Sequence, residues 1–146
     1  MSDKHFTFTL ETVQSPEKVF TAITQVRDWW TGFFGEELTG ATEKLNDTFS
    51  FRAGDGAHYS EHKLVEVVPG EKIVWLTTKS DFNFIQQKDE WTGTKVIFEI
   101  KKEGDKTKLV FTHEGLTPDV ECYNACSPAW TQYLQQKLLP LINADK

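Results

Sequence analysis

The sequence predicts an α+β fold in which an antiparallel sheet wraps around one long C-terminal helix. Three observations support this prediction: apolar and polar residues alternate along much of the chain, turn motifs separate the alternating runs, and one apolar stripe with helical spacing lies near the C-terminus. No repeat, low-complexity tract or linker interrupts the 146 residues, so we expect one domain over residues 1–146.

The first strand and the first helix are predicted from local signals. Phe6, Phe8 and Leu10 alternate with polar residues, as one face of a half-buried strand does. The segment Ser15–Glu17 then opens a helix with a capping hydroxyl, a proline at the first helical position and an acid in the first turn. Apolar residues at steps of three and four continue this short helix: Val19, Phe20, Ile23 and Val26.

Residues 36–114 are predicted to form strands joined by short turns. Three glycine-containing segments, each between alternating runs, indicate hairpin turns: Gly54–Gly56, Pro69–Gly70 and Glu103–Asp105. Short connections between successive strands predict an antiparallel meander with one face covered and one face in water. Residues 79–91 lack a clear period, and we expect a long loop or an irregular edge there.

The last element is predicted to be a helix of about 16 residues, roughly 24 Å long, that begins at Ser127-Pro128. Its apolar stripe comprises Trp130, Tyr133, Leu134, Leu138, Leu141 and Ile142. Pro140 lacks a backbone donor, so we expect a kink or fraying in the final turn.

Composition excludes several function classes. The chain has 16 basic and 22 acidic residues, and no stretch concentrates the basic ones, so we expect neither nucleic acid nor an anionic membrane as a partner. No apolar run approaches the roughly 20 residues of a membrane span, and the N-terminus has no signal-peptide core. We therefore expect a cytoplasmic protein.

The two cysteines, Cys122 and Cys126, are expected to be buried free thiols, because no secretory signal favours a structural disulfide. A metal site is the alternative, and it would need further ligands such as His113 and Glu121. We see no metal-ligand constellation, phosphate-binding loop or nucleophile motif, and we expect no metal or cofactor.

Aromatic residues make up 13% of the chain, more than a core of this size needs. Each ring taken singly is best explained as core, but the set favours an apolar cavity between the last helix and the sheet. The predicted ligand-binding residues are Trp29, Trp30, Phe33, Phe49, Phe51, Trp75, Trp91, His113, Trp130 and Tyr133.

His113 is the candidate catalytic residue, because it continues the apolar stripe of its strand and should point to the covered face. The alternative is a core histidine bonded to a backbone carbonyl. Arg52 shares a face with Ser50, and the phenylalanines beside them, Phe49 and Phe51, favour the covered side, so we expect Arg52 at the surface.

Several strings resemble the START-related superfamily of helix-grip domains, in the branch named after the C-terminal domain of the activator of heat-shock protein 90 ATPase. They are Ser15–Phe20, Trp29-Trp30, Asp89–Thr94, Phe111–Leu116 and Cys122–Trp130. The resemblance spans roughly residues 5 to 143. It implies a helix-grip fold: a seven-stranded antiparallel sheet, two short helices after the first strand, and a C-terminal helix over a hydrophobic cavity.

The resemblance implies less about activity, since members of the superfamily bind lipids, sterols, hormones or polyketides, and some are cyclases. The chaperone activator also uses a separate N-terminal domain with its own chaperone-contacting motif. The 146 residues leave no room for one, so we do not expect ATPase stimulation by this chain alone.

We expect a carrier or sensor of a small apolar or aromatic molecule rather than an enzyme. The first alternative is a cyclase or hydrolase that uses His113 with Glu61 or Tyr59. The second is a stress-related co-chaperone-like module or a homodimer that uses exposed aromatic residues: Phe33, Phe34, Phe82 or Phe84.

Overall fold

A computed structural model describes residues 5–31, 33, 35–54, 56–83, 86, 89–117 and 123–144. The strands, all antiparallel to their neighbours, form one seven-stranded sheet in the order β1-β7-β6-β5-β4-β3-β2. They are β1 (Phe6–Thr12), β2 (Glu37–Gly40), β3 (Thr48–Ala53), β4 (His58–Val68), β5 (Lys72–Phe82), β6 (Lys95–Glu103) and β7 (Lys106–Glu114).

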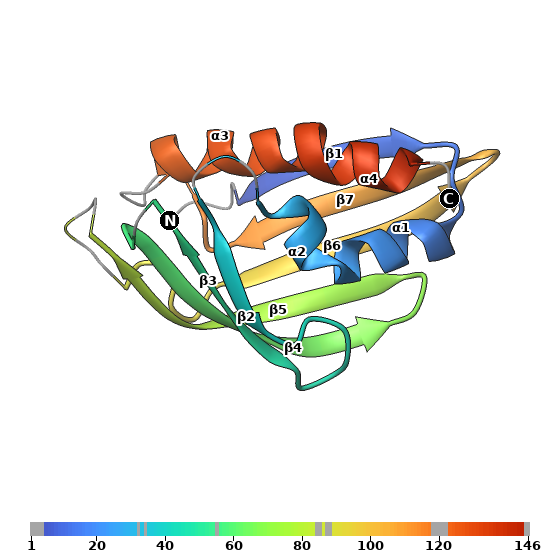
Figure 1. Cartoon of the computed structure of the whole chain (residues 1–146). Coiled ribbons are helices and arrows are strands. Elements are labelled where there is room, and N and C mark those ends of the chain that lie inside the picture. Colours follow the sequence, from blue (N-terminus) through green and yellow to red (C-terminus); the bar gives the residue numbers. More distant parts are fainter. Residues whose placement is uncertain are drawn as a thin grey trace.

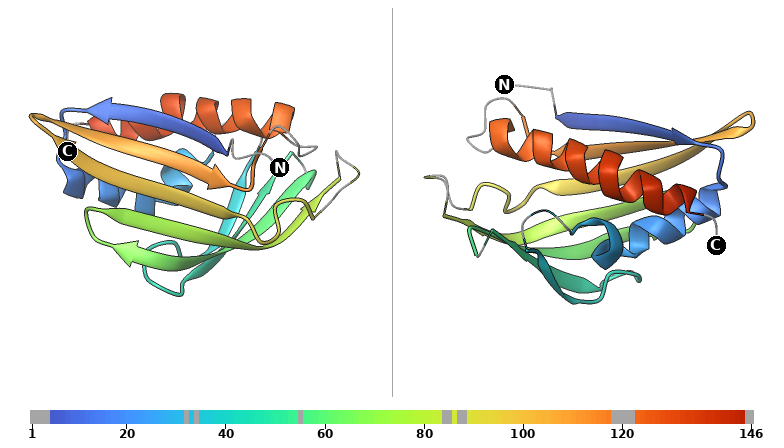
Figure 2. Two further views of the ribbon diagram at one scale, coloured as in Figure 1. Left: turned by 180° about the vertical axis from the view of Figure 1, so that it is seen from behind. Right: turned by 45° about the horizontal axis from the view of Figure 1, so that its top comes forward.

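The helices all lie on the concave side of this sheet (Figures 1 and 2). Two short helices, α1 (Pro16–Thr24) and α2 (Val26–Trp29), carry the chain from β1 at one edge of the sheet to β2 at the other. The long C-terminal helix consists of α3 (Tyr123–Tyr133), a π-helical turn η1 (Leu134–Leu138) and α4 (Leu139–Asn143). This arrangement confirms the predicted helix-grip fold.

The local predictions for the first strand, the first helix cap and two of the turns are confirmed. Phe8 is half-buried and Leu10 buried, whereas Thr7 and Thr9 are exposed. The Ser15 hydroxyl accepts a hydrogen bond from the backbone N–H of Lys18 at 3.1 Å, which caps α1. The turns at Gly70 and Gly104 are tight because both glycines adopt a positive φ (+74° and +64°) that other residues rarely tolerate.

The predicted irregular segment at residues 79–91 is partly wrong, because β5 continues to Phe82. Ser80 and Phe82 are buried while Lys79 and Asp81 are exposed, so the strand alternation persists there. Phe82 pairs with His58 of β4, which explains why the strand extends so far. Phe84 and Ile85 lie outside the described residues.

The C-terminal helix begins earlier than predicted. The Ser127 hydroxyl donates to the carbonyl of Tyr123 at 2.7 Å, a bond inside the helix, and Pro128 lies within α3. A serine hydroxyl serves either as a cap or as a donor to the carbonyl four residues before it, and the local sequence does not distinguish the two roles.

The irregularity expected at Pro140 occurs one turn before that residue. The Leu139 N–H donates to the carbonyl of Leu134, which closes the π-helical turn, and Pro140 then lies near the start of α4. Prolines and π turns are the two common causes of a bend in a helix, and here they are adjacent.

Ser15 and Ser127 allow a matched test of the two serine roles. Ser15→Ala removes a helix cap and should lower the free energy of unfolding by about 0.5–2 kcal/mol. Ser127→Ala removes only a bond to a helix carbonyl, and alanine is the better helix former, so the loss should be smaller. Urea unfolding of both variants measures the difference, and an equal or larger loss for Ser127→Ala would contradict the observed helix start.

Candidate ligand-binding site

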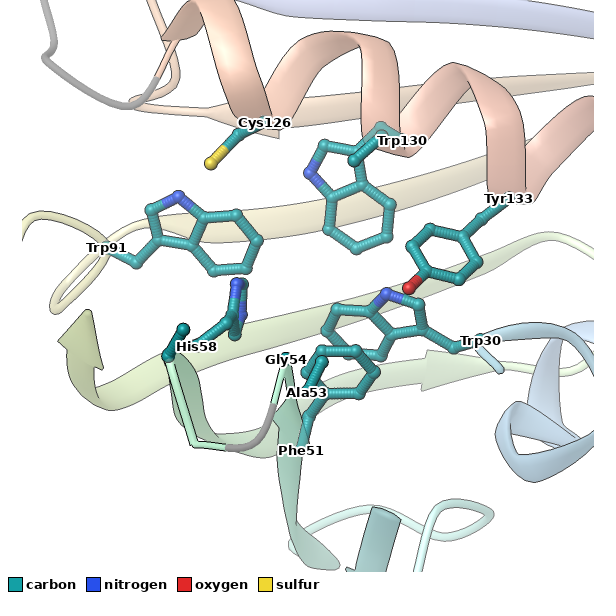
Figure 3. A pocket seen from close by; sticks show the side chains of 11 residues that line it. Trp30, Phe51, Ala53, Gly54, His58, Trp91, Cys126, Trp130 and Tyr133 are labelled. Carbon is teal, nitrogen blue, oxygen red and sulfur yellow. The ribbon is translucent and has the colours of Figure 1, made fainter. Parts of the chain in front are cut away.

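A cavity of about 270 Å³ lies between α3 and the β3–β4 end of the sheet (Figure 3). Side chains surround it from two sides: Cys126, Trp130 and Tyr133 come from the helix above, and the rings of His58, Phe51 and Trp30 lie below. Its lining consists of Trp30, Phe51, Ala53, Gly54, Ala57, His58, Trp91, Cys126, Ala129, Trp130 and Tyr133.

The helix contributes residues whose spacing places them on one face. Cys126, Ala129, Trp130 and Tyr133 follow one another at steps of three, one and three, which is the periodicity of a helical stripe. Two of these side chains are small and two are large. The small ones leave the space that the large ones enclose.

Strand β3 forms the floor by alternation. Phe51 and Ala53 are buried on the helix side, whereas Arg52 is exposed, as predicted. Phe51 stacks on Trp30 with ring centroids 3.7 Å apart and planes 12° apart. The short side chain of Ala53 leaves the cavity open beside this stack.

The indoles of Trp30, Trp91 and Trp130 stack nearly parallel to one another. Trp130 stacks on Trp30 at 4.9 Å and on Trp91 at 5.8 Å, with interplanar angles of 25° and 8°. Buried flat rings in this arrangement present apolar faces and hold one orientation, because each ring restricts its neighbours.

The sequence-predicted residues divide into two groups. Trp30, Phe51, Trp91, Trp130 and Tyr133 line the cavity. The others do not: Trp29, Phe33, Phe49, Trp75 and His113 pack behind it, with Trp29 stacked on Trp75 at 6.1 Å and Phe33 against Tyr133 at 5.2 Å.

The lining residues that the sequence reasoning missed are mostly small: Ala53, Gly54, Ala57, His58, Cys126 and Ala129. For Cys126 and Ala129 a signal was present, since both lie one helical turn from Trp130 or Tyr133. For Ala57 and Gly54 the sequence contains no comparable signal.

His113 is fully buried and holds two cavity walls in place rather than lining the cavity. Trp130 Nε1–H donates to His113 Nδ1 at 3.0 Å. The proton of the neutral ring therefore lies on Nε2, which donates to Thr94 Oγ1 at 2.9 Å. Thr94 in turn donates to the carbonyl of Trp91 at 2.6 Å.

These partners correct the expectation of a bond from His113 to a backbone carbonyl, since both partners are side chains. Burial lowers the pKa of His113 to about 3, so the imidazole is neutral at physiological pH. With both nitrogens occupied, the ring has no lone pair or proton directed at the cavity.

Two further histidines, the half-buried His58 and the fully buried His62, form a polar chain on β4. The Ser60 hydroxyl lies 3.4 Å from His58 Nε2 and 2.8 Å from His62 Nε2, and His62 Nδ1 lies 3.1 Å from Thr77 Oγ1. Burial lowers the pKa of His58 to about 3 and that of His62 well below its ordinary value. The side of the cavity that His58 forms is therefore polar but uncharged.

Tyr59 and Glu61, the proposed partners of a catalytic His113, are not placed near it. They alternate with Ser60 and His62 along β4 and lie on the opposite, outer face of the sheet. There the Tyr59 hydroxyl donates to Glu61 at 2.5 Å, which is the main cause of the raised pKa of Tyr59. The structure thus brings no carboxylate or phenol from this pair to His113.

At the other end of the cavity the Tyr133 hydroxyl donates to the carboxylate of Glu36, which also accepts from the backbone N–H of Phe33. Burial, followed by the bond to Glu36, raises the pKa of Tyr133 well above its usual range. The phenol therefore keeps its proton and stays fixed at the edge of the cavity.

The expectation of free thiols is wrong at Cys126, which is disulfide-bonded. Cysteines four residues apart near a helix start can come within bridging distance. Cys122, the other cysteine of the chain, lies outside the described residues, as does Glu121. Within the described part of the chain, no group of three or more His, Cys, Asp or Glu side chains is placed to hold a metal ion.

The three histidines with lowered pKa values make stability pH-dependent. Unfolding exposes His58, His62 and His113, whose pKa values then return to about 6.5, so the unfolded chain binds more protons. The free energy of unfolding should therefore be greatest above pH 6.5 and fall as the pH decreases toward 3.

His58→Phe should reduce the slope of unfolding free energy against pH by up to one proton, about 1.4 kcal/mol per pH unit. Urea titrations between pH 7 and 4 measure this slope. The matched control is Phe82→Leu, which alters the ring 4.3 Å from His58 and should lower stability without changing the slope. Parallel pH profiles for His58→Phe and the parent would show that His58 is not held neutral.

Comparison with known folds agrees with this geometry. The solution structure of the Aha1 dimer from Colwellia psychrerythraea is similar with a TM-score of 0.74 and 20% identity, covering 98% of this chain and 99% of that one. The Mll3558 protein from Rhizobium loti matches with a TM-score of 0.70 and 22% identity, covering 97% and 99%. The CV1439 protein from Chromobacterium violaceum matches with a TM-score of 0.69 and 19% identity, covering 96% and 99%.

A search of curated proteins found no match. In the described residues, no helix is both long and apolar enough to cross a membrane. The sequence model of one family, described as Activator of Hsp90 ATPase homolog 1-like protein, matches residues 14–141. The chain therefore belongs to the Activator of Hsp90 ATPase homolog 1-like family, the branch of helix-grip domains that its sequence resembles.

Proposed function

We propose that this protein binds a small apolar or aromatic molecule in the cavity under α3 and acts as a carrier or sensor in the cytoplasm. The observation that carries the proposal is the cavity of about 270 Å³ with walls formed by large rings. Deeply apolar cavities of about 150 Å³ already bind benzene, and drug-sized pockets begin near 300 Å³. The volume therefore suits a molecule of one or two fused rings.

The arrangement of polar groups favours binding over catalysis. His113 lies behind the wall with both nitrogens paired, and the Tyr59–Glu61 pair is on the outer face of the sheet. Catalysis of the predicted kind needs a base within hydrogen-bond reach of a substrate, and these residues do not offer one.

A protein-contact role through exposed aromatic residues has less support. Phe82, one of its predicted residues, is fully buried, and Phe33 packs against Tyr133. Phe34 and Phe84 lie outside the described residues. The solution structure of the Colwellia protein is of a dimer, so analytical ultracentrifugation of this chain is the direct test for a homodimer.

Filling the cavity should abolish binding without removing a wall. Ala129→Leu places three more carbons in the space beside Trp130, so a two-ring probe such as naphthalene should no longer raise the melting temperature. The control, Gln135→Leu, places the same leucine side chain at an exposed position of the same helix and should leave the naphthalene response intact. If naphthalene raised the melting temperature of Ala129→Leu as much as that of the parent, it would bind at another place.

Removing a wall should cost stability that a ligand partly restores. Trp130→Ala deletes a side chain that is 2% exposed and should lower the free energy of unfolding by about 3–5 kcal/mol. Excess naphthalene should raise the melting temperature of the variant, because binding to the folded state adds RT ln(1 + [L]/Kd). A variant as stable as the parent would contradict the burial of Trp130.

A further inference from the structure

One polar atom in the cavity wall has no partner. The indole Nε1–H of Trp91 is buried, and among the buried side-chain nitrogens and oxygens of the described residues it is the one without a hydrogen bond. The Trp91 side chain lines the cavity and is 3% exposed, so bulk water does not satisfy this donor. Buried donors are nearly always paired in folded proteins, and an unpaired one calls for an explanation such as an acceptor supplied by a ligand.

The backbone N–H and carbonyl of Trp91 are both hydrogen-bonded, so the indole nitrogen is the unpaired group of this residue. Its backbone N–H donates to Ser80 Oγ at 3.1 Å, and its carbonyl accepts from Thr94 at 2.6 Å. In contrast, Trp29 and Trp130 each donate their indole N–H, to the carbonyl of Ile23 and to His113.

Among the described residues, none accepts a hydrogen bond from the Trp91 indole nitrogen. Figure 3 shows its nitrogen turned toward Cys126 and away from the ring of His58. Sulfur is only a weak acceptor. A ligand acceptor placed between Trp91 and Cys126, two lining residues, would lie on the side toward which this donor is directed.

The charge of the cavity restricts what that atom can be. No lysine or arginine belongs to the cavity lining in the described part of the chain, and His58 is uncharged. A carboxylate or phosphate would lose its hydration there without gaining a cation. The acceptor must therefore be neutral: a carbonyl, an ether or a ring nitrogen.

We propose that the ligand is a neutral planar aromatic molecule with one hydrogen-bond acceptor, which Trp91 Nε1–H recognises while the other rings of the cavity lining contact the rest of the molecule. This inference rests on the proposed function and adds to it a class of ligand and a specificity-determining residue. Pairing an otherwise unsatisfied buried donor should favour such a ligand on the order of 5- to 100-fold over an isostere without the acceptor.

The test uses 1-indanone and indane, two-ring probes of nearly equal shape that differ in one carbonyl. Their dissociation constants are measured by calorimetry for the parent and for Trp91→Phe, which keeps a ring but removes the N–H. The ratio of 1-indanone to indane affinity should fall at least 5-fold in Trp91→Phe. The matched control is Trp130→Phe, because the indole N–H of Trp130 already donates to His113. This variant should weaken the binding of both probes and leave the ratio of their affinities within about 2-fold of the parent's.

A second measurement on the unaltered protein makes the result independent of how well the variants fold. In a ¹⁵N-resolved spectrum, 1-indanone should move the Trp91 indole N–H resonance downfield and indane should not. If both probes bind but the affinity ratio is the same in Trp91→Phe and the resonance is unmoved, this inference is overturned and the proposed function stands. If neither probe binds, both are overturned.

Discussion

Trp130 attaches the C-terminal helix to the sheet, and most of the remaining packing on the concave side is arranged around it. Its faces contact Trp30 and Trp91, its edge contacts Phe111 of β7, and its nitrogen is bonded to His113. The hydrogen bond fixes the rotation of an indole that stacking alone would leave free to slide. A ring held in this way becomes a wall whose position is set by β7 and not by the helix alone.

The cavity follows from the stiffness of these rings. Indoles held by stacking and by hydrogen bonds do not rearrange to fill a gap, whereas flexible aliphatic side chains would. Where Ala53 and Ala129 face the rings, the space between them stays open. The same His113–Thr94 connection that positions Trp130 also fixes the backbone of Trp91, so one neutral imidazole supports two sides of the site.

Much of the fold was predictable because its signals are local. The alternation at Phe6–Leu10, the cap at Ser15 and the turns at Gly70 and Gly104 each depend on residues a few positions apart. The failures have equally specific causes. Phe84 and Ile85 obscure the alternation that continues to Phe82, so the sequence does not show where β5 ends. Ser127 has two possible roles in a helix, and both share one local sequence pattern.

From the sequence, only the large residues of the site could be predicted. A tryptophan in the sequence indicates burial, but it does not distinguish a cavity wall from the core behind it, so the sequence does not separate Trp29 and Trp75 from Trp30 and Trp91. A cavity is defined as much by the small residues opposite the rings, and these carry no compositional signal. The partners of His113 are 17 and 19 residues away along the chain, and only the folded sheet brings them together.

The π-helical turn at Leu134–Leu138 separates the long helix into two halves with different tasks. A π turn contains one more residue than an α turn, and each residue of an α-helix advances about 100° around the axis. The residues before the turn face the cavity, while α4 beyond it packs on α1 and β1. The extra residue thus acts as a phase shift: it rotates the contact face of α4 relative to the cavity-facing stripe of α3, so that one helix serves both the cavity and the packing on α1 and β1.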